Sequence, residues 1–334
     1  MAATDKVLSI HYLRVIAALM VVCMHTFSYG LVSGYGQNPV YWMKHGVSIF
    51  FVISGFVIVT STEKAPQDGA RFFQRRFLRI APIYWIATLL LVASGISDRG
   101  DGARLLPSLL LMPTQVEGAA RLVSPTLEVG WTLCIEMAFY LLFALAMALP
   151  RRTAVVGTAS GLIVVGLLAP LLAGNPWADF YLTSLVLEFG AGMALAWSGL
   201  KAPWWLCPVG FVMMATAGAV SENHFLTASI PAIAIVAGAR GMDQWLRPIR
   251  LLVLLGDASY AIYLFHLHAL MLLVVPLVGR PAPAVVILPV GFAVAIVLGV
   301  AAHRRIEVPL AAIIAARLKR RARVSQVVPA PSPA

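Results

Sequence analysis

Apolar runs of about 20 residues recur along nearly the whole chain, and each is long enough to cross a bilayer as an α-helix. The 334 residues are 60% hydrophobic and only 12% charged, whereas a soluble domain carries about 25% charge. This pattern predicts an all-α, polytopic integral membrane protein with about ten transmembrane helices. The expected spans are residues 8–30, 44–62, 78–95, 127–148, 153–173, 180–198, 203–219, 225–239, 251–278 and 283–302.

Basic residues are distributed unevenly between the loops that join these spans. With the N-terminus in the cytoplasm, 19 of the 25 Lys and Arg residues lie on the cytoplasmic side and five on the opposite side. Cytoplasmic loops carry an excess of Lys and Arg, so this distribution predicts that both termini are cytoplasmic. Topology and attraction to anionic membrane lipid then account for the net charge of +11, and no nucleic-acid partner is expected.

The sequence divides into one membrane domain and a short tail. Residues 1–318 hold all ten expected spans and no polar region large enough to fold alone. Residues 319–334 are basic and rich in Pro and Ala, so we expect a disordered cytoplasmic tail there. The longest loop, residues 96–126, falls on the outer side, where it is either a solvated connector or a functional segment.

The first span carries two ionisable residues, Arg14 and His25. Ionisable residues are costly inside a spanning helix and mark functional sites there. The spacing corresponds to roughly three full turns, so both side chains lie on nearly one face, about 16 Å apart in depth. A neutral imidazole at that depth can take a proton from a hydroxyl as a general base. The alternative is a hydrogen-bonded histidine of the core.

Three arginines, Arg75, Arg76 and Arg79, lie where the third span enters the membrane from the cytoplasm. Guanidinium groups bind phosphate oxygens bidentately, and the N-terminus of a helix attracts the same anions. The cluster is therefore a candidate phosphate site. In the alternative interpretation these residues only anchor the topology of the span.

Polar residues also lie inside the second and fourth spans. Ser48 and Ser54 belong to a segment of small residues that either packs closely against another helix or lines a polar pocket. Glu136 lies about nine residues into the fourth span, and an unpaired carboxylate is expensive in an apolar setting. We therefore expect Glu136 to be protonated or paired, with Arg14 or a histidine as its partner.

The ninth span carries a polar stripe, because Ser259, Tyr263 and His266 follow i, i+4, i+7 spacing. Together with the first span, it supplies proton-handling groups to the membrane interior. A basic cytoplasmic mouth and such an interior fit a transmembrane transferase that uses acyl-CoA, and they also fit a proton-coupled transporter. The three cysteines lack zinc-ligand spacing, and no metal is expected.

Six segments with these features occur in a fixed order: Arg14 to His25, residues 50–56, 75–85, 131–140, 259–266 and 307–309. Each motif alone is weak, but the ordered set resembles the membrane-bound acyltransferase-3 family, whose members O-acylate extracytoplasmic glycans. Residues 150–250 are only generically similar. The segment at 129–133 most resembles the branch that acetylates bacterial exopolysaccharides.

The resemblance implies acetyl-CoA as the cytoplasmic acyl donor in a multi-pass protein of the bacterial inner membrane. The implied acceptor is a hydroxyl of an extracytoplasmic glycan, either an exopolysaccharide or its lipid-linked oligosaccharide precursor. An oligomer is compatible with the sequence. The alternative function is a transporter or flippase of glycan or acetyl groups that performs no transferase chemistry.

The resemblance also assigns roles to individual residues. His25 becomes the catalytic base with Arg14 as its motif partner, and the arginine cluster becomes the site for the CoA phosphates. The expected site residues are catalytic His25, Arg14 and Glu136, donor-binding Arg75, Arg76 and Arg79, and supporting Ser54, Tyr263 and His266.

Overall fold

The computed structural model describes residues 7–31, 38–64, 68–95, 102–115, 122–172, 174–274 and 284–327. Within these ranges the regular elements are helices, apart from one antiparallel bridge between Thr114 and Val123. The α-helices are α1 (Leu8–Leu31), α2 (Gly46–Lys64), α3 (Gly69–Ala93), α4 (Gly102–Leu109), α5 (Trp131–Ala146), α6 (Thr158–Leu168), α7 (Pro176–Tyr181), α8 (Leu185–Ser198), α9 (Leu206–Thr216), α10 (Ile230–Gly241), α11 (Arg250–Ala269), α12 (Ala284–Ala302) and α13 (Val308–Val327).

Seven helical segments of the described chain are long and apolar enough to cross a membrane. They are Leu8–Ser28, Tyr41–Glu63, Gly69–Ala93, Glu128–Ala146, Thr153–Leu172, Arg250–Leu273 and Val286–Leu318. Three shorter apolar segments, Leu185–Ser198, Leu206–Ala219 and Phe225–Gly241, fall on the sixth, seventh and eighth expected spans. An all-helical chain of membrane-protein character is thus confirmed for the described residues, while ten spans and cytoplasmic termini stay predictions.

The sixth expected span is broken into two helices. Tyr181 ends α7 and Leu185 begins α8. The side chain of Asn175 caps α7 by accepting hydrogen bonds from the backbone N–H groups of Trp177 and Ala178. Such a cap starts a helix at residue 176, before the expected span. Residues 182–184 separate this helix from α8, so residues 180–184 do not form one continuous helix with α8.

The last helix extends further than the sequence predicts. A π-helical turn, His303–Glu307, joins α12 to α13, which continues to Val327. Residues 319–327, expected to be disordered, are therefore helical, because Arg, Lys and Ala favour helix; residues 328–334 lie outside the described chain. The apolar segment Val286–Leu318 has 33 residues, and a helix of this length exceeds the roughly 30 Å hydrocarbon core.

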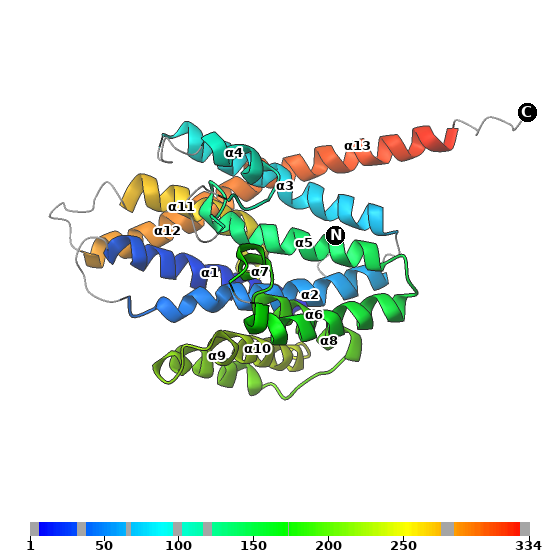
Figure 1. The fold of residues 1–334 in the computed structure, drawn as a ribbon. Coiled ribbons are helices and arrows are strands. Elements are labelled where there is room, and N and C mark those ends of the chain that lie inside the picture. The colour runs from blue at the N-terminus through cyan, green and yellow to red at the C-terminus, as the bar shows by residue number, and fades with distance from the viewer. Residues whose placement is uncertain are drawn as a thin grey trace, which may run out of the picture.

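Figure 1 shows α1, α2, α5, α6 and α8 lying side by side along one direction, with α13 projecting beyond them. Glycines bring α2 and α8 into close contact. A Cβ atom on Gly55 would lie 2.0 Å from the Phe189 carbonyl oxygen, and one on Gly192 would lie 2.0 Å from that of Val52. The small-residue segment of the second span is therefore a helix-packing surface at Gly55.

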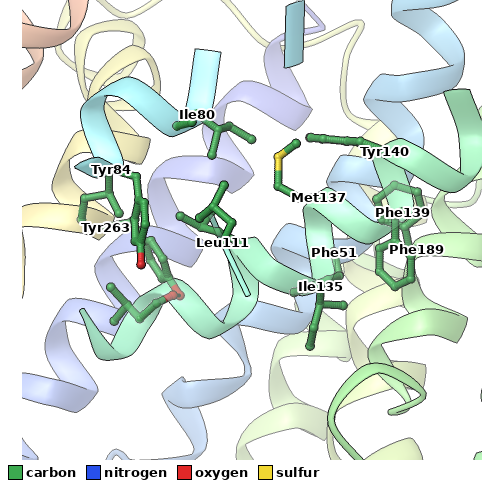
Figure 2. Packing of buried hydrophobic residues seen from close by; sticks show 14 of the residues in the cluster. Phe51, Ile80, Tyr84, Leu111, Ile135, Met137, Phe139, Tyr140, Phe189 and Tyr263 are labelled. Carbon is green, nitrogen blue, oxygen red and sulfur yellow. Dashed lines mark hydrogen bonds between the residues drawn. The ribbon is translucent and has the colours of Figure 1, made fainter. Parts of the chain in front are cut away.

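An aromatic core holds α5 against this helix pair. The ring centroids of Phe139 and Phe189 are 4.5 Å apart and the rings are tilted by 39° (Figure 2), and the Phe51 ring contacts Phe139 edge-on. Glu136 lies three positions before Phe139, on a neighbouring part of the same helix face, and it also meets α2, where Ser54 contacts it. The Tyr140 ring lies 6.4 Å from that of Phe189 on α8. The core thus sets the position of these two polar residues.

Candidate active site

A cavity of about 110 Å³ lies between α1, α2, α3, α5 and α11. Every one of these helices contributes polar side chains to it. The polar residues of the lining are Arg14, Ser54, Arg76, Arg79, Thr132, Glu136, Tyr140, Ser259, Tyr260 and Tyr263. Residues that lie in separate motifs of the sequence therefore line one site.

Hydroxyl groups satisfy the Glu136 carboxylate. Ser54 Oγ donates to Glu136 Oε1 at 2.7 Å, and the Tyr140 hydroxyl donates to the same oxygen at 2.5 Å. Arg14 lines the same cavity and interacts electrostatically with Glu136, but the hydrogen-bond partners are Ser54 and Tyr140. The structure thus places two hydroxyl groups on Glu136 Oε1, where we expected a direct pairing with Arg14 or a histidine.

Three guanidinium groups face the cavity, those of Arg14, Arg76 and Arg79. Arg76 Nη2 donates to Ser61 Oγ at 2.6 Å, and its guanidinium lies over the ring of Tyr140. Among the described lining residues, Glu136 alone carries a carboxylate. The cavity therefore has an excess of positive charge and suits an anionic ligand.

Arg75 does not line this cavity. It lines a second groove, between α3 and α13, together with Arg79 and Glu307. Arg79 borders both spaces. The structure thus brings Arg76 and Arg79 together with Arg14 in the cavity and places Arg75 in the neighbouring groove.

His25 is outside the cavity lining and contacts α11. Its Nδ1 atom lies 3.0 Å from the Val21 carbonyl oxygen and 3.2 Å from Nε2 of His266. His266 is fully buried, and its Nδ1 atom lies 2.7 Å from the Tyr263 carbonyl oxygen. Two imidazoles therefore meet where α1 and α11 pack together.

Tyr263 connects the histidine pair to the cavity. Its side chain lines the cavity, and its ring lies 6.1 Å from that of His266. The Tyr263 hydroxyl is 2.9 Å from Thr132 Oγ1 and 3.1 Å from the Val129 carbonyl oxygen. The site thus has a cationic cavity suited to an anionic group and, beside it, an imidazole pair suited to proton transfer.

Sequence reasoning missed Tyr140 and Ser61 as site residues. Tyr140 is four residues after Glu136, a spacing at which helical side chains meet, so the pair was recognisable. Ser61 is seven residues after Ser54 on α2 and lies on a similar face. Its role depends on contact with Arg76 of α3, for which the sequence carries no signal.

A second polar cluster was also missed. Glu188 of α8 is fully buried, and its Oε1 atom accepts a hydrogen bond from Ser229 Oγ at 2.8 Å and lies 3.2 Å from His224 Nε2. Ser48 Oγ lies 3.4 Å from the same His224 nitrogen. Glu188 lies in an apolar run as Glu136 does, so the cost of a buried carboxylate was the available signal.

Comparison with known proteins agrees with the resemblance to an acyltransferase family. Residues 7–304 match the sequence model of a family described as "Acyltransferase domain". The exopolysaccharide production protein ExoZ of Rhizobium meliloti is 32% identical over 288 residues, which cover 79% of this chain and 88% of that protein.

Two further relatives are more distant. Nodulation protein 10 of Rhizobium leguminosarum bv. viciae is 25% identical over 308 residues, covering 76% of this chain and 80% of the relative. Acyltransferase MdmB of Streptomyces mycarofaciens is 29% identical over 265 residues, covering 66% of each chain. No solved structure matches the chain significantly.

Proposed function

The chain belongs to the acyltransferase-3 family, and from this premise we propose that it transfers an acetyl group from cytoplasmic acetyl-CoA to a hydroxyl of an extracytoplasmic glycan. The similarity to an exopolysaccharide production protein supports an exopolysaccharide, or its lipid-linked precursor, as the acceptor. The distribution of basic residues supports an orientation with the arginine-bearing end of α3 in the cytoplasm. The similarity to proteins of bacteria supports a location in the bacterial inner membrane.

The observation that carries the donor assignment is the convergence of Arg14, Arg76 and Arg79 on one cavity. Acetyl-CoA is a thioester with several phosphates, and guanidinium groups bind phosphate more specifically than ammonium groups do. Arg79 borders both the cavity and the groove that holds Arg75. A donor with separated phosphates can therefore engage both spaces.

The reaction requires that a proton leave the acceptor hydroxyl. In the proposed step, His25 Nε2 takes this proton while the hydroxyl oxygen bonds to the thioester carbonyl carbon. The carbon–sulfur bond breaks, and CoA leaves as a thiolate that takes up a proton to become the thiol. We assign Glu136, held by Ser54 and Tyr140, to positioning the donor within the cavity.

The test uses full-length protein in nanodiscs with radiolabelled acetyl-CoA and a bacterial exopolysaccharide freed of O-acetyl groups by base. We expect free CoA thiol and labelled polysaccharide to form in equal amounts, and His25→Ala protein to form neither above background. A transporter or flippase would move glycan or acetyl groups without release of CoA thiol. That result would overturn the transferase assignment.

A further inference from the structure

The buried imidazole of His266 has a defined protonation pattern. Its Nδ1 atom faces the Tyr263 carbonyl oxygen at 2.7 Å, and a carbonyl oxygen can only accept a hydrogen bond. Nδ1 of His266 therefore carries a hydrogen. The ring is fully buried, with no carboxylate in ion-pair contact among the described residues, so a second, charging proton would be costly. Nε2 of His266 is then a hydrogen-bond acceptor.

This assignment determines the tautomer of His25. Two acceptors converge on His25 Nδ1, the Val21 carbonyl oxygen at 3.0 Å and His266 Nε2 at 3.2 Å. Only a hydrogen on Nδ1 satisfies them. Because a neutral imidazole has one N–H, Nε2 of His25 carries the free electron pair, and this atom makes no hydrogen bond to the described chain.

We propose that His266 is a positioning residue that holds His25 in the tautomer with Nδ1 protonated and Nε2 free. A base must present a free electron pair to the proton that it removes, and the partner on the opposite nitrogen selects which nitrogen does so. After proton transfer, the same two acceptors stabilise the Nδ1–H group of the charged ring. The inference rests on the proposed function only for the role of His25 as the base.

The opposite arrangement conflicts with the geometry. If His266 carried its hydrogen on Nε2, it would donate to His25 Nδ1 and place the His25 hydrogen on Nε2, where it blocks base catalysis. The unprotonated Nδ1 of His266 would then face the Tyr263 carbonyl oxygen at 2.7 Å. Two electron pairs would oppose each other in a buried site, which is unfavourable.

The first experiment measures the tautomer and needs no activity. Full-length protein with isotope-labelled histidine is placed in nanodiscs at neutral pH, and nitrogen chemical shifts distinguish protonated from unprotonated ring nitrogens. The His25 signals are identified by their loss in His25→Gln protein. We expect His25 Nδ1 protonated and Nε2 unprotonated, and a smaller excess of this tautomer in His266→Phe protein, in which the Val21 carbonyl oxygen is the remaining acceptor. A parent protein with the His25 proton on Nε2 would overturn the proposal.

The second experiment measures kinetics with a matched control on the same helix. His268 is also buried on α11, but its Nε2 atom lies 2.9 Å from the Ala87 carbonyl oxygen. We expect His266→Phe to lower kcat at least about tenfold, without reaching the full loss of a general base, about 10²–10⁴-fold, and to leave the KM for acetyl-CoA unchanged. His266→Gln restores an acceptor and should recover most of kcat, while His268→Phe should leave kcat and the His25 tautomer unchanged.

The kinetic measurements can support or contradict the role of His266. A His266→Phe enzyme with parental kcat, or a His266→Gln enzyme as impaired as His266→Phe, would overturn it. If the parent protein releases no CoA thiol, the proposed function fails, and the tautomer measurement still decides the role of His266.

Discussion

Arg14 and His25 extend from the side of α1 that faces α11, but they meet different partners. Arg14 lines a cavity with Tyr263 and Ser259, whereas His25 contacts His266, one to two turns further along α11. The two residues therefore act at different depths of one helix interface. This separation matches a transferase that binds the donor's phosphates at one level and brings its thioester to the acceptor hydroxyl at another.

The first prediction concerns His25. We expect His25→Ala to abolish glycan acetylation in cells, because loss of a general base costs about 10²–10⁴-fold. The side chain is only half-buried, so the amount of protein in the membrane should stay at the parental level. The measurement compares O-acetyl content of the exopolysaccharide with the membrane level of the protein. Near-parental acetylation at a parental protein level would contradict the assignment.

The second prediction distinguishes the arginines of α3 by their contributions to acetyl-CoA binding. A charge-assisted hydrogen bond contributes about 1.5–3 kcal/mol, so Arg76→Ala and Arg79→Ala should each weaken acetyl-CoA binding about 10–150-fold. Arg75 borders only the neighbouring groove, and we expect a smaller effect there. Lysine should restore only part of the affinity, because it lacks the bidentate geometry of Arg.

Arg71 provides the control for this series. It lies one turn before Arg75 on the same helix, is exposed and forms an ion pair with Asp68 at 3.2 Å, so Arg71→Ala should bind acetyl-CoA as the parent does. Binding is measured by titration of purified protein in nanodiscs, with membrane insertion checked in parallel. If Arg76→Ala and Arg79→Ala insert and bind with parental affinity, the donor site lies elsewhere.

The sequence was informative about helices and about which residues are unusual, and less so about their partners. Long apolar runs identified the helical segments, and Ser54 and Glu136 were recognised as polar residues within these runs. Their mutual hydrogen bond depends on α5 packing against α2. That contact is between side chains 82 positions apart in the sequence, and helical periodicity within one span does not specify it.

For the arginine cluster, helical spacing alone argues against one common site for all three residues. Adjacent residues of a helix point about 100° apart and do not face each other. Arg75 and Arg76 were therefore unsuited to a single site, whereas Arg79 is spaced to share a face with either. The structure has this arrangement, with Arg79 bordering both the cavity and the groove. Which face borders the cavity depends on the helices around it.

The third prediction concerns the contact between α2 and α8. A methyl group on Gly55 would overlap the Phe189 carbonyl group, and forced overpacking typically costs about 1–3 kcal/mol. We expect Gly55→Ala to lower the free energy of unfolding by that amount, measured as a lower midpoint of thermal unfolding in detergent. Gly161 of α6 has open space around its Cβ position, so Gly161→Ala should be neutral or stabilising. Equal midpoints for Gly55→Ala and the parent would contradict the close packing.

The fourth prediction concerns topology, which depends on whether the short helices α9 and α10 each cross the membrane. The segments Leu206–Ala219 and Phe225–Gly241 are adjacent in sequence and shorter than the about 20 residues of a typical span. With ten spans, a reporter active only outside the cytoplasm should be inactive when fused after Val327 and active when fused after Ser221 or, as a control, after residue 115. If α9 and α10 instead return to the same side as a hairpin, the Ser221 fusion becomes inactive and the C-terminal fusion stays inactive. Strong activity of the C-terminal fusion would mean an odd number of spans, and it would contradict the orientation inferred from the basic residues.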